Sequence, residues 1–209
     1  MAKVKYYSLW LALIAIIFFL IQITYPAFTD VLVLNSDAWT QPWRFVSSIF
    51  LHANAGHLLY NLFALILFGL ITEKVISSKK FLLVFFTTGI IANLVAVNFY
   101  NSSLGASGAI FGVIGALTIL KPKLPVFLFG FPLPLALASI VWIIGDVIQT
   151  IYPSNIGTIA HLSGLAIGFV FGIYYRKKLS KNKNQINYKI KIPENHMQFW
   201  EDVYMKDDR

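Results

Sequence analysis

Long apolar runs separated by short polar segments are the dominant pattern of this chain. A helix needs about 20 consecutive apolar residues to cross the hydrocarbon core of a bilayer. Six runs reach or approach this length, and they predict membrane-spanning helices at about 8–25, 57–76, 81–100, 107–120, 124–151 and 159–175. The expected fold is therefore an all-α, six-helix membrane domain over residues 1–175. It has a long external connection at 26–56 and is followed by a tail at 176–209.

The composition agrees with a membrane protein. Apolar residues make up 57% of the 209 residues and charged residues only 12%, whereas soluble domains have about 45–50% and about 25%. A soluble globule of this size cannot hide so much apolar surface. The sequence contains no cysteine, which excludes a thiol nucleophile, a cysteine zinc site and a disulfide framework.

The positive charge is placed on one side of the predicted bundle. The net charge is +8, and six crossings put 16 of the 17 Lys and Arg residues on the side that holds both termini, leaving only Arg44 opposite. Lys and Arg in short flanks mark the cytoplasmic side. We therefore expect a multi-pass protein of the plasma membrane with both termini cytosolic. This placement argues against a nucleic-acid partner and makes 176–209 a basic cytosolic tail, either solvated or resting on anionic lipid.

A few polar residues interrupt the apolar runs. Ionisable groups inside a membrane are costly and mark functional sites. His57 and Asn61 begin the second predicted span, Ser107 begins the fourth and His161 lies near the start of the sixth. These three spans enter from the same side, so the four residues are expected at one depth below the outer surface.

Stripes of small residues explain how two of these spans approach each other. Small residues spaced four apart let membrane helices pack backbone to backbone. The fourth span has such a stripe beside Ser107 and the sixth has one beside His161; they comprise Gly108, Gly112 and Ala116, and Ala160, Gly164, Gly168 and Gly172. This packing would bring a hydroxyl to an imidazole.

The chemistry of such a pair is that of a serine nucleophile with a histidine base. A histidine within about 2.6–3.2 Å activates a serine hydroxyl by taking its proton. Gly105 and Gly108 flank Ser107 and permit a tight loop with close backbone approach. Ser107 also opens a helix, where free N–H groups and the helix dipole favour a developing negative charge.

Three further side chains fit the same site. His57 and Asn61 are four residues apart and share a helix face, from which a ring N–H and an amide N–H can stabilise an oxyanion. Phe111 lies one turn after Ser107 and can pack against the His161 ring.

At this point the chain resembles the rhomboid family of intramembrane serine proteases. The resemblance covers about residues 8–175 and rests on four motifs: Trp43-Arg44 in the first external loop, His57-x-x-x-Asn61, Gly105-Ala106-Ser107-Gly108, and Ala160-His161-x-x-Gly164 followed by Gly168. It implies a catalytic dyad of Ser107 and His161 without a third acidic member, and no metal or other cofactor. It also implies cleavage of transmembrane segments of other membrane proteins near the outer face, among membrane lipids.

Other activities fit less well. A zinc protease would need His-Glu-x-x-His, which is absent, and an aspartyl protease would need a second membrane aspartate beside Asp146. A catalytically inactive, client-binding relative would lack Ser107 or His161. A small transporter using His57, His161 and Asp146 would show an inverted repeat.

Asp146 is expected near the outer end of the fifth span, facing the aqueous site or interacting with Arg44. Asn101 begins a glycosylation sequon on an external loop.

Overall fold

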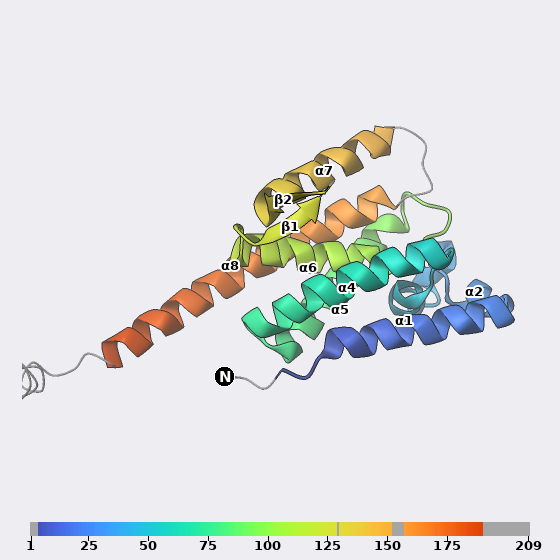
Figure 1. Cartoon of the computed structure of the whole chain (residues 1–209). Coiled ribbons are helices and arrows are strands. Elements are labelled where there is room, and N and C mark those ends of the chain that lie inside the picture. Colours follow the sequence, from blue (N-terminus) through green and yellow to red (C-terminus); the bar gives the residue numbers. More distant parts are fainter. Residues whose placement is uncertain (1–3, 129, 152–156, 190–209) are drawn as a thin grey trace, which may run out of the picture. The chain divides into compact units, whose positions relative to one another are not determined.

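The computed structural model describes residues 4–128, 130–151 and 157–189. The chain divides into two units, Met1–Tyr175 and Arg176–Arg209. The first unit is a bundle of helices (Figure 1). Its principal helices are α1 (Tyr7–Thr24), α4 (Ala55–Ile76), α5 (Ser78–Ala96), α6 (Ser107–Leu120), α7 (Leu135–Ile151) and the part of α8 (Thr158–Lys189) up to Tyr175.

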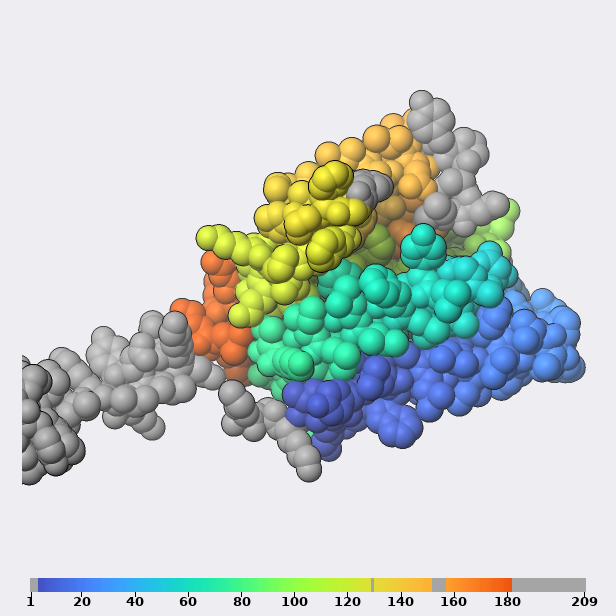
Figure 2. Space-filling view, viewed as in Figure 1, coloured from blue at the N-terminus to red at the C-terminus, as the bar shows by residue number. Residues whose placement is uncertain are grey.

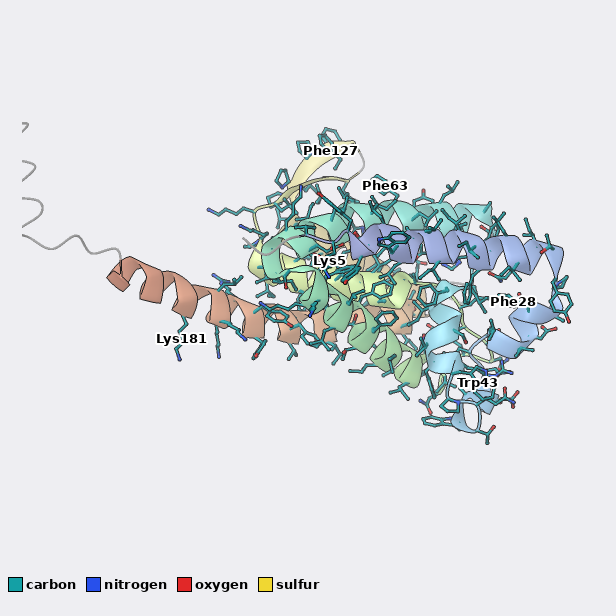
Figure 3. The ribbon with its side chains drawn as sticks, turned by 90° about the horizontal axis from the view of Figure 1, so that it is seen from below. Lys5, Phe28, Trp43, Phe63, Phe127 and Lys181 are labelled. Atoms are coloured by element: carbon teal, nitrogen blue, oxygen red, sulfur yellow. The ribbon has the colours of Figure 1, made fainter. Side chains whose placement is uncertain are left out.

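Four helices are long and apolar enough to cross a membrane: Tyr7–Thr24, Ala55–Ile76, Ser78–Ala96 and the Thr158–Lys181 part of α8. Helices α6 and α7 are also apolar but shorter, with 14 and 17 residues. Large apolar side chains such as Trp10, Phe63 and Ile144 are exposed on the helix surfaces, and Figure 3 shows Phe63 projecting from α4. Such a surface suits lipid better than water.

The predicted fifth span is wrong over residues 124–134, because α7 begins only at Leu135. Strands β1 (Pro125–Leu128) and β2 (Phe131–Pro134) pair in antiparallel fashion, so the fold is not purely α. Proline lacks the backbone N–H that a helix interior needs, and Pro132 and Pro134 stand where the helix was expected. Gly130, at φ 83°, accommodates the turn. Phe127 points away from the helices on this hairpin (Figure 3).

The connection at 26–56 contains short helices: α2 (Ala27–Leu32), α3 (Arg44–Ser47) and 3₁₀ turns at Ser36–Trp39 and Ser48–Phe50. Buried Arg44 holds this connection together, since its guanidinium donates to the Gln41 side chain at 2.7 Å and to the carbonyls of Asp30 and Val33 at 2.8 and 2.7 Å. Trp43 beside it is half exposed (Figure 3). The arginine thus satisfies backbone groups that no regular element pairs.

The connection is also tied to the segment that leads into α6. Leu34 and Ser103 form an isolated antiparallel bridge, with N–H to O distances of 3.1 and 2.8 Å. Two segments far apart in the sequence are therefore held side by side just before Ser107.

Helices α6 and α8 approach each other backbone to backbone. A Cβ atom added to Gly164 would collide with the carbonyl oxygen of Gly108, and one added to Gly168 would collide with that of Gly112. Only glycine allows this backbone contact. The small-residue stripes therefore do pack against each other, as the sequence predicts.

Helix α1 is fixed to α4 by a buried carboxylate. Glu73, in the last turn of α4, is fully buried and accepts hydrogen bonds from the Tyr7 N–H, the Ser8 N–H and the Ser8 hydroxyl at 3.1, 2.8 and 2.8 Å. A carboxylate at a helix amino end satisfies free N–H groups and complements the helix dipole. Figure 2 shows α1 lying along α4 at the surface.

Candidate active site

The amino ends of α4, α6 and α8 lie at the same end of the bundle (Figure 1). Ser107 is the first residue of α6, and His161 lies in the first turn of α8. His57 and Asn61 lie in the first two turns of α4. Residues that the sequence places on three separate helices are thus gathered at one level.

Ser107 and His161 are in hydrogen-bond contact. The Ser107 Oγ atom lies 2.8 Å from the His161 Nε2 atom, within the range expected for a nucleophile and its base. The Phe111 ring stacks on the imidazole, with centroids 4.4 Å apart and planes 2° from parallel. The imidazole is held on one face by this ring and at one edge by the hydroxyl.

The turn before Ser107 passes close to His57. Gly105 has φ 123°, a conformation that side chains rarely adopt. A Cβ atom at Gly105 would lie 2.7 Å from Cε1 and 2.9 Å from Nε2 of the His57 ring. Glycine is therefore required here for two reasons. Because it has no side chain, the His57 ring can reach the turn at 105–107, which we call the serine loop.

Asn61 is buried, with 6% of its surface exposed, and its side-chain Nδ2 donates to the His57 carbonyl at 2.9 Å. The amide has a second N–H. No hydrogen bond within the described parts of the chain joins Asn61 to Ser107 or His161. The Asn61 side chain is thus held by its own helix, α4, rather than by a hydrogen bond to the pair.

Two residues missed by the sequence interpretation support the serine loop. The Gly105 N–H donates to the Ser48 carbonyl at 2.9 Å. The Ser48 hydroxyl accepts from Asn93 Nδ2 at 3.0 Å, and the same amide donates to the Phe45 carbonyl at 2.9 Å. Asn93 is a buried polar residue within an apolar run, and this interruption of the run is a sequence signal that could have revealed its supporting role. Ser48 gives no such signal.

Asp146 lies beside His161. Its Oδ1 and Oδ2 atoms are 3.4 and 3.3 Å from the His161 Nδ1 atom, and only the Oδ1 contact has hydrogen-bond geometry. Of the two environments expected for Asp146, the interaction with Arg44 is wrong, because that guanidinium bonds within its own connection. Sequence reasoning left Asp146 without a role because the rotation of α7 could not be read from an apolar run.

A second histidine is buried behind His57. His52 is 2% exposed, and its ring meets that of His57 edge to face at 5.2 Å between centroids. Burial, helped by the neighbouring His57, lowers the pKa of His52 to about 4, while the Phe50 carbonyl opposes this shift. His52 is therefore neutral at physiological pH. Among the described residues, no group of three His, Asp or Glu side chains is arranged to hold a metal ion.

Comparison with known proteins gives the family. The Rhomboid domain model matches residues 39–178. Similar proteins include the rhomboid protease GlpG of Haemophilus influenzae, 30% identical over 162 residues, which cover 76% of this chain and 78% of that protein. Others are the mitochondrial Rhomboid protein 1 of Saccharomyces cerevisiae and Rhomboid-like protease 1 of Toxoplasma gondii, 29% and 32% identical over 74% and 67% of this chain.

The chain spans about half the length of the yeast and Toxoplasma proteins, 48% and 49%, and about three quarters of the Haemophilus protein. The family model matches well over half of the chain, including Ser107, Phe111, Asp146 and His161. The chain is an integral membrane protein and belongs to the rhomboid family.

Proposed function

We propose that this protein is an intramembrane serine protease whose catalytic dyad is Ser107 and His161. The observation that carries the proposal is the 2.8 Å contact between Ser107 Oγ and His161 Nε2. The family relatives named as proteases support the same activity. A catalytically inactive, client-binding protein would have no need of this pair.

The dyad acts in two stages. His161 Nε2 takes the Ser107 hydroxyl proton while Oγ attacks the carbonyl carbon of the substrate peptide bond. The imidazolium then gives this proton to the leaving amine, and an acyl-enzyme remains on Ser107. Water, deprotonated by His161, attacks the acyl carbon and releases the carboxylate product and the free serine.

The oxyanion of each tetrahedral intermediate needs hydrogen-bond donors. The Ala53 N–H lies 3.5 Å from His57 Nδ1, an arrangement that favours a proton on His57 Nε2, the atom close to the serine loop. The second Asn61 amide N–H and the free backbone N–H of Ser107 complete the set. Gly105, Gly108, Phe111 and Gly164 have supporting roles, in the turn, the helix packing and the ring stacking.

We also propose that the first unit crosses the membrane six times. Helix α6, with 14 residues, is about 21 Å long, shorter than the hydrocarbon core of about 30 Å. A short span places Ser107 below the membrane surface rather than at it. The partners are then transmembrane segments of other proteins, reaching Ser107 from the surrounding lipid.

The distribution of charge supports a cytosolic location for both termini. With six crossings, 16 of the 17 cations fall on the side of the amino terminus and of the basic tail at 176–209, which supports a cleavage site near the outer face. We propose the plasma membrane as the location, although the yeast relative is named as mitochondrial.

The experiment uses a fluorophosphonate probe and a model single-span substrate in liposomes. Wild-type protein should be labelled and should cleave the substrate, whereas Ser107→Ala and His161→Ala should do neither while keeping the wild-type melting profile. Cleavage by Ser107→Ala at the wild-type rate would overturn the proposal. Substrate capture without labelling or cleavage by the wild type would identify a client-binding protein instead.

A further inference from the structure

Asp146 is a buried carboxylate in an apolar helix. It is 6% exposed, and within the described parts of the chain its only charged or hydrogen-bonding side-chain partner is His161. Burying a carboxylate in a membrane protein is costly unless a partner compensates for the lost water. The presence of this buried acid in α7 therefore points to a role in which His161 takes part.

Asp146 contacts the ring nitrogen that faces away from the serine. The His161 Nε2 atom lies 2.8 Å from Ser107 Oγ, whereas Nδ1 lies 3.3 and 3.4 Å from the two carboxylate oxygens. A carboxylate accepts hydrogen bonds and cannot donate one. It therefore favours a proton on Nδ1, which leaves the Nε2 lone pair directed at the Ser107 hydroxyl.

Helix α7 is fixed at the rotation that this contact requires. Ser139, Trp142, Asp146 and Thr150 recur every three or four residues and so share one face of α7. The Ser139 hydroxyl lies 2.7 Å from that of Thr118 in α6, and the Thr150 hydroxyl lies 3.1 Å from that of Thr158 in α8. Polar contacts on both sides of Asp146 thus direct its carboxylate to His161.

Aromatic contacts reinforce the same face. The Trp142 ring lies edge-on to Phe111, with centroids 6.4 Å apart, and Phe111 stacks on His161. The imidazole is therefore restrained by a hydroxyl, a carboxylate and a ring. Each restraint comes from a different contact, and two of the three come from α6.

We infer that Asp146 is a positioning residue, which holds the His161 imidazole in the tautomer that accepts the Ser107 proton and stabilises the imidazolium that forms. This inference rests on the proposed function, and it changes the expected two-residue dyad into a three-group arrangement. The contact is longer than a charge-assisted hydrogen bond of about 2.7–2.9 Å, so it has room to shorten when His161 becomes charged.

The test measures the rate at which a fluorophosphonate labels Ser107, together with kcat and KM for the single-span substrate. Asp146→Asn should label about 10- to 100-fold more slowly and lose kcat to the same extent, with KM unchanged. The effect should be smaller than the about 10⁴-fold cost of the equivalent change in a serine protease triad, because the contact is longer. Asp146→Glu should recover part of the rate.

Thr72→Ala is the matched control, because Thr72 is a buried polar residue near the carboxyl end of α4 whose hydroxyl donates to the Phe68 carbonyl of its own helix and takes no part in placing Asp146. It should lower the melting temperature without slowing the labelling of the folded protein. If Asp146→Asn labels at the wild-type rate, or if both variants lose rate only in proportion to their unfolded fraction, the inference is overturned.

A second measurement separates this inference from the proposed function. Nitrogen chemical shifts of isotope-labelled histidine, assigned to His161 by their loss in His161→Ala, report which ring nitrogen carries the proton. The wild type should be protonated on Nδ1 and Asp146→Asn should not. The tautomer result does not depend on probe labelling. If the wild type failed to react with the probe, the proposed protease activity alone would be rejected. If His161 had the same tautomer in both proteins, the role of Asp146 would be overturned.

Discussion

Ser107 Oγ and His161 Nε2 lie 2.8 Å apart although 54 residues separate them in the sequence. The contact depends on the close approach of α6 and α8, in which Gly164 meets the Gly108 carbonyl. Each residue stands in the first turn of its helix, so the depth of both is set by where the helices begin. Helix packing and helix start together place the hydroxyl at the imidazole.

The stacking of Phe111 on His161 should contribute to catalysis through orientation of the ring. An aromatic pair is worth about 0.5–1.5 kcal/mol beyond its buried area, which corresponds to at most about a tenfold change in rate. Phe111→Ala should therefore lower kcat by up to about tenfold, measured on the single-span substrate. Phe111→Tyr keeps the ring and should keep the rate; equal losses in both variants would contradict an effect of stacking.

Asn61 should support catalysis as an oxyanion donor. Loss of one such donor typically lowers kcat by about 10²- to 10³-fold. Asn61→Ala should show a loss of this order, with residual cleavage remaining because the His57 ring and the Ser107 N–H still donate. Asn98→Ala provides the control, since Asn98 is exposed just after α5 and, within the described parts of the chain, its side chain bonds only to carbonyls of the last turn of that helix. Wild-type kcat in Asn61→Ala would remove this residue from the proposed site.

The contact between α6 and α8 should not tolerate a side chain at Gly164. A Cβ there would collide with the Gly108 carbonyl oxygen, whereas one at Gly145 in α7 meets no atom of the described residues within 4 Å. Overpacking costs about 1–3 kcal/mol, and this collision involves backbone, so we expect the upper end. Gly164→Ala should lower the free energy of unfolding in mixed micelles and slow probe labelling.

Gly145→Ala is the matched control for this change. It should leave stability unchanged or slightly raised, because alanine favours a helix over glycine by about 1 kcal/mol. Equal stability of Gly164→Ala and Gly145→Ala would show that α6 and α8 are not packed as closely as the glycines indicate.

Apolar runs alone predicted most of the helices but could not show where they bend or how they rotate. The run at 124–151 is continuous in hydropathy, and the hairpin that interrupts it follows from Pro132 and Pro134, whose effect on the backbone is local. The glycine stripes predicted the α6–α8 contact because glycine spacing carries its own steric requirement. No such marker defines the rotation of α7, so the contact of Asp146 with His161 could not be foreseen.

The support of the serine loop was equally hidden, because it runs through backbone groups. Gly105 bonds the Ser48 carbonyl, which any residue would supply. A sequence motif records side chains. The path from Asn93 through Ser48 to Gly105 uses only two side chains, those of Asn93 and Ser48, and its last step joins two backbone groups.

Asn93 should therefore matter for both stability and activity. It is buried and donates to Phe45 O and Ser48 Oγ. Leaving such acceptors without a partner costs about 1–3 kcal/mol. Asn93→Ala should lower the unfolding free energy by this amount and slow Ser107 labelling at temperatures where the protein is folded, while Asn98→Ala changes neither. A loss of stability with unchanged labelling would limit Asn93 to a structural role.

His52 should make the stability of the protein depend on pH. Burial lowers its pKa to about 4 from 6.5, so between these values the unfolded chain binds a proton that the folded protein does not. The contribution of neutral His52 to the free energy of unfolding is fully present above about pH 6.5 and is lost as the pH falls toward about 4. Between about pH 7 and about pH 5 the loss should be about 2 kcal/mol.

The variant His52→Gln isolates this contribution from those of other titrating groups. Glutamine does not titrate, so the unfolding free energy of His52→Gln should fall less steeply than that of the wild type over the same pH range, whatever the constant cost of replacing the ring. Unfolding in mixed micelles at several pH values measures both slopes. Parallel slopes would mean that His52 is protonated equally easily in the folded and unfolded protein, and that its burial beside His57 does not exclude the charged form.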